Sequence, residues 1–183
     1  YITLRLNFGY MMKNSKILID RYGRIHDYLR ISVTDKCNFR CFYCNPNTAK
    51  DCNAGKDSLL SFEEISRVIN LFSNKFGFNK FRFTGGEPLV RKGFVDFLFD
   101  VQNLKNKFNF KVGLTTNGYL LSDYLPQIID AGVDYINVSL DTLDRIKFKQ
   151  ITKIDVYDNV LKSINNTLEY GFNELKINVV IMK

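Results

Sequence analysis

Three cysteines are the residues of this sequence best suited to chemistry. Cys37, Cys41 and Cys44 lie within eight residues at CxxxCxxC spacing, and a fourth cysteine, Cys52, follows in a polar stretch. Such a tight group does not suit an ordinary disulfide framework and favours thiolate ligation of a metal in a reducing compartment. Three thiolates can hold three irons of a [4Fe–4S] cube and leave the fourth iron open to a small ligand. A structural zinc site, which takes four Cys or His ligands, and three unligated buried thiols remain as alternatives.

A glycine-rich turn is the second feature that could serve a ligand. The segment Gly85-Gly86-Glu87-Pro88 follows the cysteines by about 40 residues. Glycine permits close backbone approach, so the turn either receives a ligand or connects a strand to a helix. Polar residues also follow two later apolar runs, at Thr115–Gly118 and Asn137–Asp141. They need hydrogen-bond partners, which are either neighbouring backbone or a ligand.

The elements that position these residues alternate between strands and helices. Five apolar, β-branched-rich runs predict strands, at Leu29–Thr34, Lys80–Thr84, Lys111–Thr116, Tyr135–Leu140 and Leu175–Met182. Helical periodicity predicts a helix from a capping box at Ser61 to a left-handed cap at Gly77, and further helices over Phe94–Phe108, Ser122–Ala131 and Val160–Leu168. Near-continuous apolar strands alternating with helices predict an α/β fold with a parallel sheet, either a barrel or an open sheet. Ligands of such folds gather at the carboxyl ends of the strands, where the residues above lie.

Length and composition predict one globular domain. The chain has 183 residues, of which 45% are hydrophobic and 14% aromatic, and residues 1–16 are expected to be a ragged extension. Charged or amide residues interrupt every apolar run before the roughly 18 to 20 residues of a membrane span, so we expect no membrane association and a cytoplasmic location. The net charge of +7 suits either an anionic ligand such as a nucleotide or a lysine-rich solvated surface. The basic residues do not cluster with aromatics as in nucleic-acid-binding segments, so nucleic acid is not an expected partner.

The cysteine loop and the glycine turn together resemble a known superfamily. CxxxCxxC with an aromatic residue, Tyr43, before the last cysteine is similar to the signature loop of the radical S-adenosylmethionine (SAM) superfamily. The GGEP turn resembles the turn that holds the SAM amino group in these enzymes. The resemblance implies an incomplete (βα) barrel of about five parallel strands with helices on its outer face, and a [4Fe–4S] cluster on Cys37, Cys41 and Cys44. It also implies SAM as a cofactor that an electron donor helps to split into methionine and a 5′-deoxyadenosyl radical.

A narrower resemblance runs from about Ile17 to Lys183. The segments Ile19–Arg24, Tyr28–Cys41 and Lys80–Arg91 are similar to the GTP 3′,8-cyclases of molybdenum cofactor biosynthesis. Tyr43, Gly86 and Ser139 match SAM-contacting positions of that family, and Arg30, Arg82, Thr115 and Lys176 match GTP-contacting positions. The implied reaction removes hydrogen from the ribose C3′ of GTP and joins C3′ to guanine C8, which gives 3′,8-cyclo-GTP.

Three of the basic residues support an anionic substrate by a separate argument. Arg30, Arg82 and Lys176 lie in predicted strands with apolar neighbours. Charged side chains are seldom buried without a partner, and a triphosphate would be one. The alternative is that each faces solvent at the edge of the sheet.

The family resemblance also indicates what this sequence lacks. Its members continue with a sixth strand and a carboxyl-terminal region that binds a second [4Fe–4S] cluster, so we expect residues 17–183 to be a truncated radical SAM core without full cyclase activity alone. Another radical SAM enzyme, such as a peptide- or sulfatase-modifying member, is the first alternative, and a basic Arg30 and Lys176 argue against it. A non-catalytic zinc-binding module is the second. We expect Cys52 to be an unligated thiol and His26 to be a surface or structural residue; a homodimer stays open as the assembly.

Overall fold

The computed structural model describes residues 17–44, 59–172 and 174–182, and its main element is a parallel sheet. The sheet has five strands in the order β3-β4-β5-β6-β7. Their bounds are β3 Tyr28–Ser32, β4 Lys80–Thr84, β5 Lys111–Thr116, β6 Tyr135–Ser139 and β7 Leu175–Asn178. Each strand pairs with its predecessor in the chain, so the sheet winds in one direction, as in a barrel, without the reversal of a doubly wound sheet. The predicted α/β fold with five parallel strands is therefore confirmed, and β3 and β7 are the edges of the described sheet.

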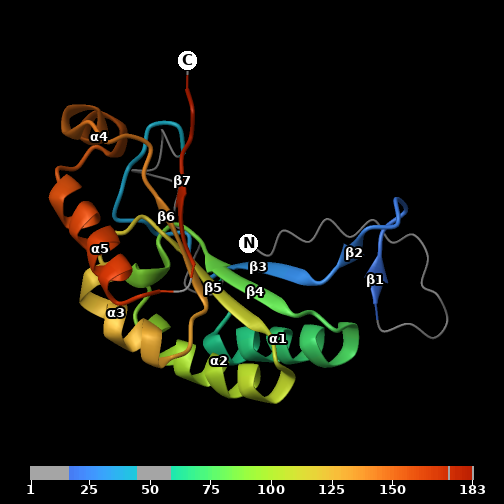
Figure 1. The fold of residues 1–183 in the computed structure, drawn as a ribbon. Coiled ribbons are helices and arrows are strands. Elements are labelled where there is room, and N and C mark those ends of the chain that lie inside the picture. The colour runs from blue at the N-terminus through green and yellow to red at the C-terminus, as the bar shows by residue number, and fades with distance from the viewer. Residues whose placement is uncertain (1–16, 45–58, 173, 183) are drawn as a thin grey trace.

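Helices cover one face of this sheet (Figure 1). They are α1 Phe62–Phe76, the short 3₁₀ helix η2 Pro88–Val90, α2 Phe94–Phe108, α3 Leu121–Asp130, α4 Arg145–Thr152 and α5 Tyr157–Glu169. The start of α1 confirms the predicted capping box, since the Ser61 hydroxyl accepts from the backbone N–H of Glu64 and the Glu64 carboxylate accepts from the N–H of Ser61. Gly77 ends α1 in the left-handed conformation, with a φ of 69°.

The strands present one apolar and one polar face, because side chains alternate along a strand. On β3 and β4, Leu29, Ile31, Phe81 and Phe83 are buried in the core that the helices complete. The residues between them point to the opposite face. We name that surface the polar face; it consists of Tyr28, Arg30, Ser32, Lys80, Arg82, Thr84, Gly113, Thr115, Tyr135, Asn137, Ser139, Lys176 and Asn178. Helices on one face agree with the outer layer of helices that the family resemblance implies. The near-continuous apolar strands that we expected are not found in β3 and β4, where buried and more exposed residues alternate.

Four of the described elements were not predicted from the sequence. Strands β1 Leu18–Ile19 and β2 Ile25–His26 form an antiparallel pair before the main sheet. The other two are η2, which begins at Pro88 after the glycine turn, and α4, whose start is capped by the Asp144 side chain. His26 lies 3.6 Å from the carboxylate of Asp20 in the first hairpin, which agrees with its expected structural role.

Some predicted boundaries and residues need comment. The first, fourth and fifth strands were predicted to run through Thr34, Leu140 and Met182, but they end at Ser32, Ser139 and Asn178. The expected extension at 1–16 and the expected unligated thiol of Cys52 lie outside the described residues. Within the described ranges, no helix combines the length and the apolar character that crossing a membrane requires.

Candidate functional site

The cysteine loop follows β3 at the carboxyl edge of the sheet and is anchored on α4. The backbone N–H of Arg40 donates to the carbonyl of Thr152 at 2.9 Å, and that of Phe42 donates to the carbonyl of Ile151 at 3.3 Å. The ring of Phe39 is buried edge-to-face against Phe148, with centroids 5.8 Å apart. A helix more than 100 residues later in the chain thus fixes the loop.

The three thiols of this loop influence one another electrostatically. Burial raises the pKa of Cys41 to about 11, and the nearby Cys37, Asp141 and Cys44 act in the same direction. The residue Cys37 is exposed overall, but partial desolvation of its sulfur also raises the pKa of this thiol, although the N–H of Phe39 donates to the sulfur at 3.3 Å and opposes the shift. Thiolates in this loop therefore need positive charge close by, which bound iron would provide.

The three thiols could serve either kind of metal centre. Among the described residues, which leave out Cys52, no three His, Cys, Asp or Glu side chains converge closely enough to hold one metal ion. In an iron–sulfur cube each thiolate binds a different iron, whereas a structural zinc ion takes four ligands at a single metal.

The glycine turn packs directly against the cysteine loop. The N–H of Gly86 donates to the carbonyl of Thr34 at 2.7 Å, and that of Glu87 donates to the carbonyl of Lys36 at 2.8 Å. A Cβ atom at Gly85 would lie 2.4 Å from the carbonyl oxygen of Thr34, and one at Gly86 would lie 2.2 Å from that of Lys36. Both positions therefore require glycine for this close approach, whether or not Gly86 also contacts a ligand.

Glu87 is a central residue of the site. From the sequence, this residue was expected only to help fix the glycine turn. Its side chain is buried at 0% exposure, and all of its described hydrogen bonds are accepted from donors around it. Oε1 accepts from the Thr116 hydroxyl at 2.9 Å and the Leu89 N–H at 3.1 Å, and Oε2 accepts from the Asn117 N–H at 2.6 Å. The carboxylate thus ties the glycine turn to the carboxyl end of β5. Neighbouring glycines and a proline in the sequence do not indicate where such a carboxylate points.

Asn117 extends this network to the cysteine loop. Its Nδ2 donates to Oδ1 of Asn38 at 2.7 Å and lies 3.8 Å from the sulfur of Cys37. A continuous chain of contacts therefore runs from Glu87 through Asn117 to the first cysteine.

The buried carboxyl of Glu87 should make folding stability depend on pH. Burial raises its pKa from 4.5 to about 7, against the three donors, so between these pH values the folded state holds a proton that the unfolded state releases. The part of the folding stability that this bound proton contributes is thus fully present below pH 4.5 and is lost as pH rises through 7, and it amounts to at most about 3 kcal/mol. Urea titration measures the free energy of unfolding of wild type and of Glu87→Gln from pH 4.5 to 7.5. The value for wild type minus the value for Glu87→Gln should fall as the pH rises. A difference that stays constant with pH would contradict the shifted pKa.

The structure places the predicted SAM-contacting residues at the same edge. Gly86 follows β4, Ser139 ends β6, and Tyr43 lies in the cysteine loop. The Tyr43 hydroxyl donates to Oδ2 of Asp141 at 2.6 Å, and Oδ1 of Asp141 accepts from the N–H of Val180 at 2.9 Å. Burial and the Asp141 carboxylate raise the pKa of Tyr43, so this phenol stays protonated and donating.

The predicted GTP-contacting residues all lie on the polar face, but their surroundings differ from the expectation. Arg30 pairs in register with Arg82, while Thr115 and Lys176 each pair with Asn137. Arg30 is exposed, and the Lys176 ammonium is exposed and ion-paired with Glu174 at 2.5 Å. The expectation that Arg30 and Lys176 have apolar surroundings and need a phosphate to compensate burial is therefore wrong, because alternate residues of these strands face away from the core.

Several buried polar atoms near these residues lack a hydrogen-bond partner within the described residues. They are Nδ2 of Asn38, Nε of Arg82, Oγ1 of Thr115, the hydroxyl of Tyr135 and Oδ1 of Asn137, together with the distant Oγ of Ser73. Buried polar groups are normally paired, so the first five mark the polar face and the cysteine loop as a surface with unused hydrogen-bonding capacity. A polar ligand could satisfy them.

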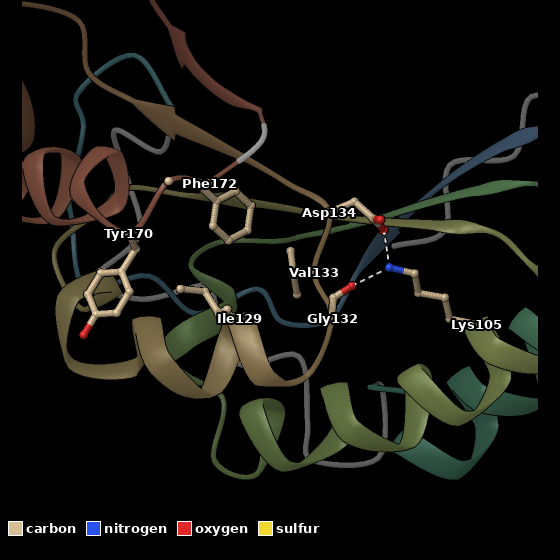
Figure 2. A pocket seen from close by; sticks show the side chains of 8 residues that line it. Lys105, Ile129, Gly132, Val133, Asp134, Tyr170 and Phe172 are labelled. Carbon is tan, nitrogen blue, oxygen red and sulfur yellow. Dashed lines mark hydrogen bonds and ion pairs between the residues drawn. The ribbon is translucent and has the colours of Figure 1, made fainter.

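A pocket of about 280 Å³ lies at the other end of the sheet, beside the amino ends of β6 and β7. It is lined by Lys105, Ile129 and the segments 132–134 and 170–172 (Figure 2). The Lys105 ammonium donates to the Gly132 carbonyl at 2.6 Å and pairs with Asp134 at 2.8 Å. Because this charge is already neutralised and the pocket is remote from the cysteines, we assign the site to the carboxyl edge.

Sequence comparison identifies relatives over most of the chain. The chain is 44% identical over 169 residues to the mitochondrial GTP 3′,8-cyclase of Arabidopsis thaliana. The match covers 92% of this chain and 42% of that protein. It is 46% identical over 168 residues to the GTP 3′,8-cyclase of Campylobacter fetus subsp. fetus, with 91% and 50% covered. It is 43% identical over 169 residues to the human molybdenum cofactor biosynthesis protein 1, with 92% and 26% covered. The chain thus spans half or less of the length of these relatives.

Solved structures share the fold at low sequence identity. The anSMEcpe enzyme with bound AdoMet has a TM-score of 0.65 and 19% identity, and the match covers 83% of this chain and 43% of that one. HydG, a hydrogenase maturase, has a TM-score of 0.62 and 18% identity, with 84% and 34% covered. The sequence profile of the radical SAM superfamily matches residues 31–183, which is most of the chain. This chain therefore belongs to the radical SAM superfamily.

Proposed function

We propose that this chain is the amino-terminal part of a GTP 3′,8-cyclase of molybdenum cofactor biosynthesis. The observation that carries the proposal is the 44% and 46% identity to two named cyclases over about nine tenths of the chain. The polar face supports it, because it offers basic and hydroxyl side chains beneath the cysteine loop. The reaction would join C3′ of the GTP ribose to C8 of its guanine.

Membership of the superfamily supports SAM and an iron–sulfur cluster as cofactors. We assign the cluster as [4Fe–4S], held by Cys37, Cys41 and Cys44, with one iron open to SAM. When SAM is bound to the cluster and an external electron donor reduces the cluster, the two cofactors would supply the 5′-deoxyadenosyl radical. A reducing compartment such as the cytoplasm suits these exposed and half-exposed thiols.

Three residues at the carboxyl edge are assigned to SAM. Gly86 presents backbone beside the cysteine loop, where any side chain would obstruct a ligand as well as the loop. Ser139 lies half-buried at the end of β6. Tyr43 is held beside the last cysteine by its hydrogen bond to Asp141, so its ring can border the space in front of the cluster.

The basic side chains of the polar face are assigned to GTP. The guanidinium groups of Arg30 and Arg82 come from register partners on β3 and β4, and such forks match phosphate oxygens. The hydroxyl of Thr115, which lacks a partner among the described residues, can donate to the nucleotide. Lys176 can exchange its exposed contact with Glu174 for a phosphate, since exposed ion pairs contribute little.

The variant Arg30→Gln should weaken GTP binding while leaving SAM binding unchanged. Loss of a charge-assisted hydrogen bond costs about 1.5 to 3 kcal/mol, which corresponds to roughly 10- to 100-fold in Kd. Calorimetric titration of the anaerobically reconstituted chain with GTP, and separately with SAM, measures both. The matched control is Arg67→Gln, an exposed arginine on α1. Equal GTP affinity in Arg30→Gln and Arg67→Gln would contradict the assignment.

Catalysis is tested by incubating the reconstituted chain with SAM, GTP and dithionite and analysing the products by mass spectrometry. The proposal predicts 5′-deoxyadenosine and, once the chain is supplied with the rest of the cyclase, 3′,8-cyclo-GTP. If GTP is recovered intact from the complete cyclase carrying this sequence, the proposed substrate is wrong.

A further inference from the structure

Tyr135 occupies a position on the polar face that no assignment above explains. It is the first residue of β6 and is 1% exposed, yet it lies outside the hydrophobic core formed with the helices. Its ring extends across the neighbouring strand β5 at Gly113, its register partner. A Cβ atom at Gly113 would lie 2.1 Å from Cε2 and 2.2 Å from Cζ of the tyrosine. The ring can therefore lie there only because residue 113 has no side chain.

Across Gly113 the ring meets two cations of β4. The Arg82 Cζ lies 4.9 Å and the Lys80 Nζ 4.4 Å from the ring centroid of Tyr135. Tyr28 of β3 provides a second ring, 5.6 Å from the Arg82 Cζ and 5.7 Å from the Lys80 Nζ. Two tyrosines from non-adjacent strands thus flank both cations, at distances typical of cation–π contacts.

This arrangement restrains Arg82 without occupying its Nε donor. Within the described residues Arg82 has no ion pair, and its buried Nε has no acceptor. A ring over the guanidinium plane leaves the N–H donors at the edge of that plane available. The nearby charges are those of Arg30 and Lys80, which repel Arg82, and of Glu174, which is attracted mainly to Lys176. The aromatic contacts therefore hold the guanidinium where like charge would otherwise displace it.

We propose that Tyr135 is a positioning residue, which together with Gly113 fixes the guanidinium of Arg82 on the polar face with its donors directed to the anionic part of a substrate. Only the identity of that substrate, GTP, rests on the proposed function. The positioning itself can be tested without any nucleotide.

The first test measures the order of the Arg82 side chain by NMR in the anaerobically reconstituted chain. The Arg82 Nε–H signal, identified by its loss in Arg82→Lys, should exchange slowly with water in wild type and in Tyr135→Phe, which retains the ring. In Tyr135→Leu and in Gly113→Ala, whose methyl group displaces the ring, exchange should be at least about tenfold faster. Unchanged exchange in both of these variants would overturn the proposal.

The second test asks whether Tyr135 acts through Arg82. Tyr135→Leu should raise the Kd for GTP about tenfold and leave the Kd for SAM unchanged, while Tyr135→Phe retains wild-type affinity. In an Arg82→Lys background, which lacks the planar guanidinium, the same Tyr135→Leu change should have less than about twofold effect. An equal tenfold effect in both backgrounds would overturn the proposal. If the wild-type chain binds no GTP, the substrate assignment fails, and the exchange measurement still decides the positioning role.

Discussion

Replacing Cys41 with alanine is expected to remove most of the bound iron and abolish reductive cleavage of SAM. Cys41 is the central member of the three-thiol group, and its loop is anchored on α4 through the backbone of Arg40 and Phe42. Two remaining thiolates cannot hold three irons of a cube. After anaerobic reconstitution, Cys41→Ala should hold only a small fraction of the iron and sulfide of wild type. Its rate of 5′-deoxyadenosine formation with dithionite should be at least about 100-fold lower, the scale expected for loss of a cofactor rather than of one contact.

The control for this variant is Cys52→Ala. It removes a cysteine of the same chain that we do not assign to the cluster, and we expect it to keep the iron content of wild type. If Cys41→Ala retained its iron, or if both variants lost it equally, ligation by these three cysteines would be contradicted.

Replacing Glu87 with alanine is expected to have the largest effect on stability among substitutions outside the core. Its buried carboxylate accepts hydrogen bonds from Thr116, Leu89 and Asn117, and alanine would leave these donors unpaired around a cavity. Breaking a buried polar network of this kind costs about 3 to 5 kcal/mol. The free energy of unfolding, measured by urea titration at pH 7 under anaerobic conditions, should fall by that amount.

The exposed carboxylate of Glu169, in the last turn of α5, provides the control. Glu169→Ala should change the free energy of unfolding by no more than about 0.5 kcal/mol, as is usual for surface substitutions. A loss below about 1 kcal/mol in Glu87→Ala would mean that water or a rearranged turn satisfies the three donors, and the described network would not be a determinant of the site.

Features that depend on nearby residues could be predicted from the sequence. The bounds of β4 and β5 agree with the predicted Lys80–Thr84 and Lys111–Thr116, and the cap at Ser61 is as expected. Strand pattern and capping chemistry are local properties, so they can be read along a single segment. The parallel pairing of the strands also followed from the alternation of strands and helices, but that alternation left a barrel and an open sheet as alternatives, and the family resemblance implied the barrel.

Features that depend on pairing between distant segments could not be predicted in the same way. Two of the three partners of the Glu87 carboxylate lie about 30 residues away in sequence, and α4 holds the cysteine loop from more than 100 residues away. The ring of Tyr135 over Gly113 depends on the register of β5 and β6. The sequence did contain one unused signal: Lys80 to Thr84 alternate polar and apolar residues, which indicates a strand with one polar face.

The central claim is that three thiolates hold an iron–sulfur cluster with a vacant iron at the carboxyl edge of this sheet. The most direct measurement is low-temperature electron paramagnetic resonance of the reconstituted, reduced chain before and after addition of SAM. We predict the signal of a reduced [4Fe–4S] cluster whose g values shift when SAM binds. A preparation without an iron–sulfur signal, or one whose signal is identical with and without saturating SAM, would contradict the account.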